Sequence, residues 1–224
     1  MLRMPPILPD VQRPQAILFD WDNTLVDSWA TIHEALNYVM AAMDKPLWSI
    51  AETRARVRLS LRESFPRHFG ERWEEAREIY LGRFRAIHLE RLAALPGRSE
   101  LLEALVREGI FLGVVSNKTG ALLRREAERL GWSRHFGRIV GAGDAAADKP
   151  HPAPVGFALE PSGVLAGEAV WFVGDTGIDM ECAANAGCIP VLLGGDPASE
   201  ELLHSAPRLQ FSEPAALLRF IRGL

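Results

Sequence analysis

Near the start of the chain, residues 16–24 read AILFDWDNT. The first four of these residues are apolar, and such a short run is typical of a strand buried on both faces of a parallel sheet. Asp20 and Asp22 follow the run, two residues apart. Because side chains alternate along an extended backbone, we expect both carboxylates to point to the same side of the sheet.

The carboxylates of Asp20 and Asp22, held this close, resist joint ionisation unless a cation lies nearby or one of them keeps its proton. Folding gains nothing from that arrangement, whereas covalent catalysis does, because one carboxylate can attack while its neighbour moves a proton. We therefore interpret the two residues as a catalytic pair. A helix N-cap or an Asp-Asn turn is the alternative, since Asp and Asn are common in both.

Two later apolar runs end in polar residues that could join this pair, and a Pro-rich loop between them adds a lysine. Residues 111–119 read FLGVVSNKT, residues 148–150 read DKP, and residues 169–179 read AVWFVGDTGID. In an open α/β sheet, ligands bind outside the carboxyl ends of the strands. We therefore expect the polar ends of these segments to converge with the acidic pair on one crevice.

Taken in order, these segments make the sequence resemble the haloacid dehalogenase superfamily, and within it the phosphatases similar to phosphoglycolate phosphatase. The family's first motif, Asp-x-Asp-x-Thr, matches residues 20–24, and its second, a Ser or Thr at a strand end, matches Ser116. The third, a Lys before Pro, matches Lys149, and the fourth, Gly-Asp-x-x-x-Asp, matches residues 174–179. The resemblance spans about residues 17–193, and four motifs in the family's order are a far more specific signal than any one alone.

The resemblance implies a role for each matched side chain. Asp20 would be the nucleophile that forms an aspartyl-phosphate, and Asp22 would protonate the leaving alcohol and then take a proton from water. The phosphate would be bound by Thr24, Ser116, Asn117 and Lys149, and the alternative for the Thr24 hydroxyl is that it serves mainly the turn itself. Without the other motifs, an ordinary strand-end serine and a solvated lysine would be the simpler readings of Ser116 and Lys149.

Asn23 departs from the family pattern, because it stands where the family usually has Gly. Asn is the next most tolerant residue of a left-handed backbone conformation. We therefore expect a sharp turn at Asn23, preserved at small cost.

The charge of the acidic residues predicts a metal ion. Four carboxylates would face a dianionic phosphate with only Lys149 to offset them, and an oxygen-rich site of this kind suits Mg²⁺. By resemblance, Asp20 and Asp175 are side-chain ligands, Asp22 binds through its carbonyl oxygen, and Asp179 lies behind them or binds through water. The alternative for Asp175 and Asp179 is an acidic first turn of a helix, which the helix dipole favours.

The pattern of apolar residues predicts an α/β fold, with a Rossmann-like, doubly wound parallel sheet and an inserted, all-helical cap. Residues 28–94 contain no strand-like run and show helical periodicity instead, with apolar residues at steps of three and four. From residue 95 onward, helix and strand patterns alternate. We therefore predict a core of residues 1–27 and 95–224 and a cap of residues 28–94, which resembles the family's first type of cap.

Substrate specificity is expected to come from the cap, because every residue assigned to the phosphate belongs to the core. The break between two predicted cap helices, residues 44–49, offers Lys45 and Trp48. Nearby, Arg56 or Arg58 could meet a substrate carboxylate. The alternative is that Trp48 only packs the cap and that the arginines form a solvated face.

Composition excludes several other classes of protein. The 224 residues carry a formal net charge of −4, which argues against a general nucleic-acid binder. No apolar stretch is long enough for a membrane span, and residues 1–10 have prolines where a signal peptide needs an apolar core, so we expect a loose tail there. Cys182 and Cys188 are expected to be buried thiols, which favours a reduced, cytoplasmic setting. The sequence makes no prediction of the oligomeric state.

Together these features predict a Mg²⁺-dependent phosphatase of a small phosphorylated metabolite. Asp22 favours phosphoryl transfer, since the family's dehalogenases lack a second carboxylate. A Schiff base, as in phosphonate-cleaving relatives, would need Lys45, the one lysine of the predicted cap. A phosphomutase shares all four motifs and remains the first alternative. A non-catalytic protein that binds a phosphorylated ligand on this fold, or a signalling receiver, is the second.

Overall fold

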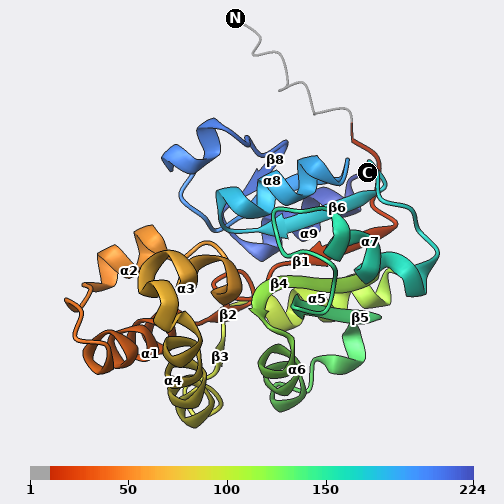
Figure 1. Ribbon diagram of the computed structural model, residues 1–224. Coiled ribbons are helices and arrows are strands. Elements are labelled where there is room, and N and C mark those ends of the chain that lie inside the picture. Colours follow the sequence, from red (N-terminus) through yellow and green to blue (C-terminus); the bar gives the residue numbers. More distant parts are fainter. Residues whose placement is uncertain (1–10) are drawn as a thin grey trace, which may run out of the picture.

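The computed structural model describes residues 11–224, and the predicted loose tail of residues 1–10 lies outside the described residues. A central sheet carries helices on both faces and lies beside a second, all-helical part of the chain (Figure 1). This arrangement confirms the predicted α/β fold with a helical insert.

The central sheet has six strands in the order β5-β4-β1-β6-β7-β8, and every neighbouring pair is parallel. Its strands are β1 Ala16–Phe19, β4 Phe111–Thr119, β5 Arg138–Ala142, β6 Val170–Gly174, β7 Ile189–Leu193 and β8 Leu209–Phe211. From β1 the chain builds the sheet first to one side, through β4 and β5, and then to the other, through β6 to β8. The strand order therefore reverses at β1, and such a switch point is where ligands bind in doubly wound sheets.

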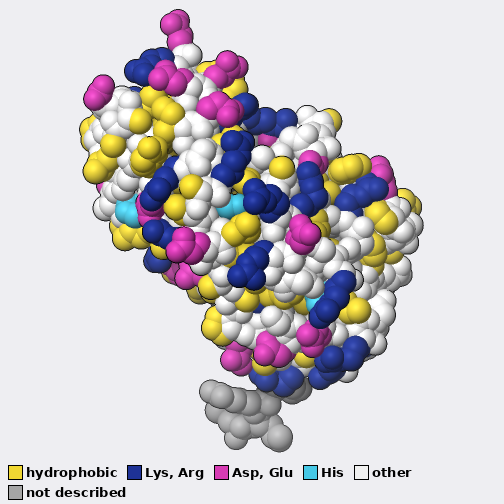
Figure 2. Space-filling view, turned by 90° about the horizontal axis from the view of Figure 1, so that it is seen from below, with side chains coloured by type: hydrophobic (Ala, Val, Ile, Leu, Met, Phe, Trp, Pro, Cys, Tyr) yellow, Lys and Arg dark blue, Asp and Glu magenta, His cyan; other side chains and the backbone are white. Residues whose placement is uncertain are grey.

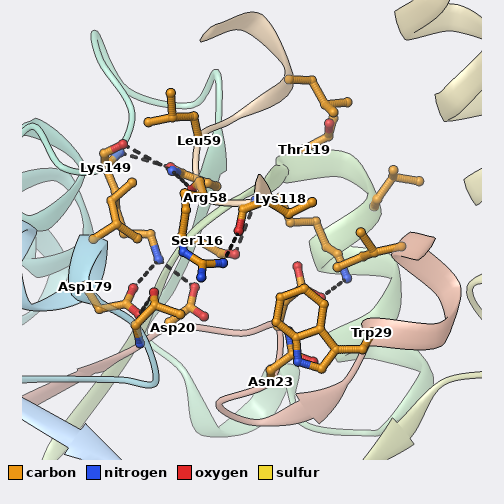
Figure 3. A pocket seen from close by; sticks show the side chains of 18 of the residues that line it. Asp20, Asn23, Trp29, Arg58, Leu59, Ser116, Lys118, Thr119, Lys149 and Asp179 are labelled. Atoms are coloured by element: carbon orange, nitrogen blue, oxygen red, sulfur yellow. Dashed lines mark hydrogen bonds and ion pairs between the residues drawn. The ribbon is translucent and has the colours of Figure 1, made fainter. Parts of the chain in front are cut away.

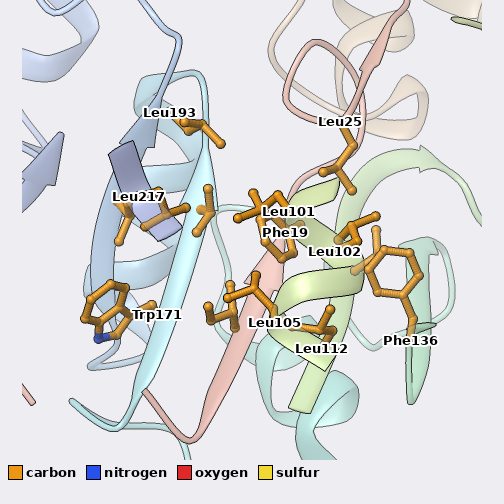
Figure 4. Close-up of a cluster of buried hydrophobic side chains, with 14 of the residues drawn as sticks. Phe19, Leu25, Leu101, Leu102, Leu105, Leu112, Phe136, Trp171, Leu193 and Leu217 are labelled. Carbon is orange, nitrogen blue, oxygen red and sulfur yellow. The ribbon is translucent and has the colours of Figure 1, made fainter. Parts of the chain in front are cut away.

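Strand β1 forms the centre of the core, and all four of its residues are fully buried. Ile17 and Phe19 pack in one cluster with leucines of α5 (Arg98–Arg107) and α9 (Pro214–Arg222), which Figure 4 shows. Leu18 points to the other face, toward α7 (Ala153–Leu159) and α8 (Gly177–Asn185). Helices on both faces explain why the run is apolar at every position.

The helical part contains α1 (Trp29–Ala42), α2 (Ile50–Arg56), α3 (Leu61–Phe69) and α4 (Trp73–Ile87). The predicted helical periodicity is confirmed, because apolar residues spaced in this way on α1 and α4 belong to the buried cluster of this part. The cluster includes Ile32, Leu36, Met40, Met43, Ala76, Tyr80 and Phe84.

The two connections between the helical part and the sheet run side by side. Strands β2 (Val26–Asp27) and β3 (Ala93–Ala94) form a short antiparallel pair. Next to them, the Leu95 backbone N–H donates to the Leu25 carbonyl at 3.0 Å. This pairing is what an insertion into a core requires. The exact boundaries at residues 28 and 94 stay a prediction.

Among residues 11–224, the remaining helices are α6 (Gly120–Arg129) and four short 3₁₀ segments. These are η1 (Gly70–Arg72), η2 (Ser133–His135), η3 (Glu160–Ser162) and η4 (Glu200–Leu203). Strand β4 is longer than its apolar run, since it continues to Thr119, and its register with β5 shifts between Val115 and Thr119. The irregular end of β4 carries Ser116 and Asn117.

On the face seen in Figure 2, basic, acidic and apolar side chains are interspersed. No helix among residues 11–224 combines the length and the apolar character needed to cross a bilayer. Cys182 and Cys188 are both buried and unpaired, as predicted.

Candidate active site

A pocket of about 120 Å³ opens at the carboxyl ends of β1, β4 and β6, between the sheet and the helical part. The structure brings most of the predicted site residues to this pocket (Figure 3). Those that line it are Asp20, Asp22, Ser116, Asn117, Lys149, Asp175 and Asp179. The expected convergence of the strand ends on one crevice is therefore observed.

Lys149 links two of the acidic residues. Its Nζ donates to Asp20 Oδ1 at 2.6 Å and to Asp179 Oδ1 at 2.7 Å, and all three side chains are buried. Burial alone would lower the pKa of the Lys149 ammonium, but the carboxylates of Asp179 and Asp20 raise it well above its ordinary value. The lysine is therefore charged, and its reading as a solvated surface residue is wrong.

Three carboxylates form a cluster beside Lys149. One oxygen each of Asp20, Asp175 and Asp179 lies within 4.8 Å of the others. Burial raises the pKa of Asp20 to about 6 against the opposing effect of Lys149, and burial together with Asp179 and Asp20 raises the pKa of Asp175 well above its ordinary value. A largely buried set of carboxylate oxygens with too little positive charge nearby fits a hard cation such as Mg²⁺.

Asp179 combines two structural roles. Its Oδ2 accepts a hydrogen bond from the Thr176 backbone N–H at 3.1 Å, which belongs to the capping box of α8, and another from the Thr176 hydroxyl at 2.9 Å. Its other oxygen accepts from Lys149. The alternative reading of Asp179 as an acidic first turn is therefore correct locally, and the same side chain also belongs to the carboxylate cluster.

The turn after β1 has the predicted form. Asn23 adopts a left-handed conformation with a φ of 65°, and its backbone N–H donates to the Val26 carbonyl at 2.7 Å. The Arg98 side chain, which is buried, donates to the Thr24 carbonyl at 2.8 Å. These bonds fix the loop that carries the acidic pair.

Thr24 lies behind the carboxylate cluster instead of on the pocket surface. It is fully buried, and its hydroxyl donates to Asp175 Oδ1 at 2.9 Å. The prediction that Thr24 binds phosphate therefore gains no support from its position. Its hydroxyl instead orients the carboxylate of Asp175, which directly follows the neighbouring strand β6.

Asn117 connects three segments around the pocket. Its side-chain oxygen accepts from the Lys149 backbone N–H at 3.0 Å, and its amide donates to the Lys149 carbonyl at 3.1 Å and to the Arg58 carbonyl at 3.3 Å. These bonds hold the loop that contains Lys149 against the end of β4. Ser116, in contrast, lines the pocket with a buried hydroxyl whose oxygen accepts from the Lys118 backbone N–H at 3.2 Å.

Asp22 points away from the carboxylate cluster and toward Lys118. The Lys118 Nζ donates to Asp22 Oδ1 and to Glu126 Oε2, each at 2.6 Å. Burial opposes the charge of Lys118, but the two carboxylates raise the pKa of its ammonium above the ordinary value. The predicted metal contact of Asp22 concerned its carbonyl oxygen and stays a prediction.

The sequence analysis did not identify Lys118, a basic residue that lines the pocket. Lys118 stands two residues after Ser116 at the strand end, which could have drawn attention to it. Arg58, one of the two arginines proposed for a substrate carboxylate, lines the same pocket (Figure 3), whereas Arg56 does not.

The predicted specificity loop lies elsewhere. Within the described residues, neither Lys45 nor Trp48 lines the pocket. The Lys45 Nζ lies 5.7 Å from the centre of the Phe69 ring, and the Arg56 guanidinium lies 4.9 Å from that of Trp48. The alternative, in which Trp48 packs the cap, therefore describes its position better.

Residues 17–192 match a family model described as haloacid dehalogenase-like hydrolase. The phosphoglycolate phosphatase of Xanthomonas campestris pv. campestris (strain 8004) is 30% identical over 217 residues, which cover 91% of this chain and 97% of that protein. The phosphoglycolate phosphatase of Rhodospirillum rubrum is 34% identical over 192 residues, which cover 80% of this chain and 79% of that protein. A haloacid dehalogenase-like hydrolase of Streptococcus pneumoniae has a structure that superposes with a TM-score of 0.80 at 26% identity, covering 93% of this chain and 98% of that one.

The chain therefore belongs to the haloacid dehalogenase-like hydrolase family, and it is an enzyme. Within that family it is similar to proteins named phosphoglycolate phosphatase. The resemblance that the four motifs indicate is confirmed.

Proposed function

We propose that this hydrolase is a Mg²⁺-dependent phosphatase of a small phosphorylated metabolite that also carries a carboxylate. The observation that carries the proposal is the contact of Lys149 with both Asp20 and Asp179 beside Asp175. A buried carboxylate next to a cation and further acidic groups is suited to attack on a phosphate whose charge is neutralised by a metal. Phosphoglycolate is the first substrate to test, because relatives carry its name.

The reaction would proceed in two steps on the side chains of β1 and its loop. An Asp20 carboxylate oxygen attacks the phosphorus, the bond from phosphorus to the alcohol oxygen breaks, and Asp22 gives its proton to that oxygen. Water then attacks the phosphorus of the aspartyl-phosphate, and Asp22 takes a proton from the water. The bond to Asp20 breaks, which releases inorganic phosphate and restores the enzyme.

Asp20 and Asp175 would hold Mg²⁺, with the carbonyl oxygen of Asp22 as a third protein ligand and Asp179 behind them. When bound, the ion supplies positive charge that lets a dianionic phosphate approach the ionised nucleophile. Asp179 and Thr24 are then suited to orient their neighbours, since each contacts another site residue. Ser116 and Lys149 are the side chains best placed to bind the phosphate oxygens.

Arg58 is the proposed contact for the carboxylate of the substrate. Its guanidinium faces the pocket from the helical part and forms an ion pair with Glu201 of the core. Arginine suits this role because its planar fork binds carboxylates in two places at once. The carboxylate of a small substrate would replace Glu201 as the partner of the Arg58 guanidinium.

The pocket also limits the size of the substrate. Arg62 of α3 forms an ion pair at 2.5 Å with Asp148, next to Lys149, so the helical part lies directly over the site. The residues that the helical part contributes to the pocket wall are mostly apolar. They include Ile32, Val57, Leu59, Leu61, Tyr80, Leu81 and Phe84. A site covered in this way leaves no room for a folded phosphoprotein, and closure of the helical part over it would exclude bulk water during chemistry.

The test is phosphate release from a panel of phosphorylated metabolites that includes phosphoglycolate, with Mg²⁺ and with excess chelator. We expect Mg²⁺-dependent release of inorganic phosphate, fastest from small phosphorylated carboxylates. A phosphomutase would instead move the phosphate without net release, and a binding protein would retain the ester. No release from any ester would overturn the proposal. The cytoplasmic setting expected from the sequence stays a prediction.

A further inference from the structure

A buried network of charged side chains lies beneath the acidic loop, on the side away from the carboxylate cluster. Lys118, at the end of β4, contacts both Asp22 and Glu126. The side chains of Lys118 and Glu126 are 5% and 1% exposed. Charged groups are almost never buried this deeply unless they are paired, and removing one partner is strongly destabilising.

Glu126, on α6, is held from three directions. Its Oε2 accepts from the Trp21 indole N–H at 2.7 Å and from Lys118, and its Oε1 contacts His88 Nδ1 at 2.8 Å. Trp21 stands between the two catalytic aspartates in the sequence. The network therefore fixes Lys118 through one carboxylate and Asp22 through Lys118.

The helical part also touches this network. His88 follows α4, and the ring of Phe84 on that helix lies 5.1 Å from the Lys118 Nζ. Lys118 consequently sits between a fixed carboxylate, an aromatic ring and Asp22. Its ammonium has few other positions available.

We propose that Lys118 and Glu126 are positioning residues that hold Asp22 in the orientation needed for proton transfer. Lys118 binds Oδ1 of Asp22. The other oxygen, Oδ2, is then the one that gives a proton to the leaving group and takes a proton from water. Glu126 acts one step further away, because it fixes the ammonium of Lys118. This inference rests on the proposed phosphatase function and adds two residues to it.

The test compares two leaving groups. An alkyl phosphate such as phosphoglycolate needs a proton on its leaving oxygen, whereas 4-nitrophenyl phosphate releases an acidic phenol that leaves without one. The quantity measured is kcat/KM, which reports the steps up to phosphorylation of Asp20. Because positioned proton transfer contributes about 10²–10⁴-fold, we expect Lys118→Met to lose at least about tenfold more on the alkyl than on the aryl phosphate.

A second set of variants separates positioning from folding. Glu126→Gln keeps the shape of the side chain and should show the same preference for loss on the alkyl phosphate, and it replaces Lys118→Met if that variant fails to fold. In an Asp22→Asn background, Lys118→Met should add little further loss, because the two residues act as a unit. Lys45→Met, a lysine outside the pocket, is the control and should change neither substrate.

Equal losses on both substrates, or full additivity with Asp22→Asn, would overturn the positioning role while leaving the phosphatase intact. If the unmodified enzyme released phosphate from neither ester, the proposed function itself would fail, and this inference with it.

Discussion

The Lys149 Nζ lies 2.6 Å from Asp20 Oδ1, although 129 positions separate the two residues in the sequence. One residue follows β1 and the other stands in the loop before α7, so the parallel sheet is what brings them together. Lys149 also contacts Asp179, and through these bonds one ammonium holds the proposed nucleophile and a second carboxylate in place.

Substitution of the acidic pair should separate the two proposed roles. Asp20→Asn should abolish turnover and any acid-stable phosphoenzyme, because the amide cannot attack phosphorus. Asp22→Asn should lower turnover by about 10²–10⁴-fold, the usual contribution of general acid–base catalysis. Phosphate release and labelling with a ³²P ester provide the measurements. Near-native activity of Asp20→Asn would show that another residue is the nucleophile.

Removal of Mg²⁺ with a chelator should silence the enzyme, since the three clustered carboxylates would otherwise repel the phosphate. Asp175→Ala should raise the Mg²⁺ concentration needed for half-maximal activity or end activity altogether. Ca²⁺ should inhibit, because its larger and more flexible coordination shell can move the nucleophile out of line. A titration of activity against each ion is the measurement, and full activity in chelator would contradict the metal site.

Lys149→Met should destabilise the fold as well as end catalysis. Removing one partner of a buried ion pair costs about 3–5 kcal/mol, because the remaining charges lose their partner. We expect a loss of this size in the free energy of unfolding in urea without Mg²⁺, and a smaller loss with Mg²⁺, whose binding to the native state offsets part of it. Lys45→Met is the matched control, and an equal effect of both substitutions would disprove the structural role.

Arg58→Gln should raise KM for phosphorylated carboxylates by about tenfold or more, the loss expected for a charged hydrogen bond of about 1.5–3 kcal/mol. An aryl phosphate without a carboxylate should be affected less. The double substitution Lys45→Ala and Trp48→Ala tests the specificity loop expected from sequence, and neither residue lines the pocket. If that double variant lost activity only on the natural substrate, and Arg58→Gln kept normal activity on it, residues 44–49 would be the source of specificity.

The pattern of apolar residues and the conformational preferences of single residues made much of the fold predictable from the sequence. The run at residues 16–19 is apolar at every position because β1 is buried on both faces, and Asn23 marks a left-handed turn because few other residues tolerate one. The periodic apolar residues of α1 and α4 likewise indicated their buried faces. Such signals depend only on neighbours in the chain, so no tertiary information is needed to interpret them.

The partners of the site residues were decided by the tertiary structure alone. Asp22 meets Lys118 across 96 positions of sequence, and Arg58 meets Glu201 across 143. Thr24 was expected at the phosphate but donates to Asp175, because burial of the turn directs its hydroxyl toward the next strand. A motif specifies which chemical groups reach one end of the sheet. Which of them bond to each other depends on the packing of α4 and α6 against that end, and on the need of every buried charge for a partner.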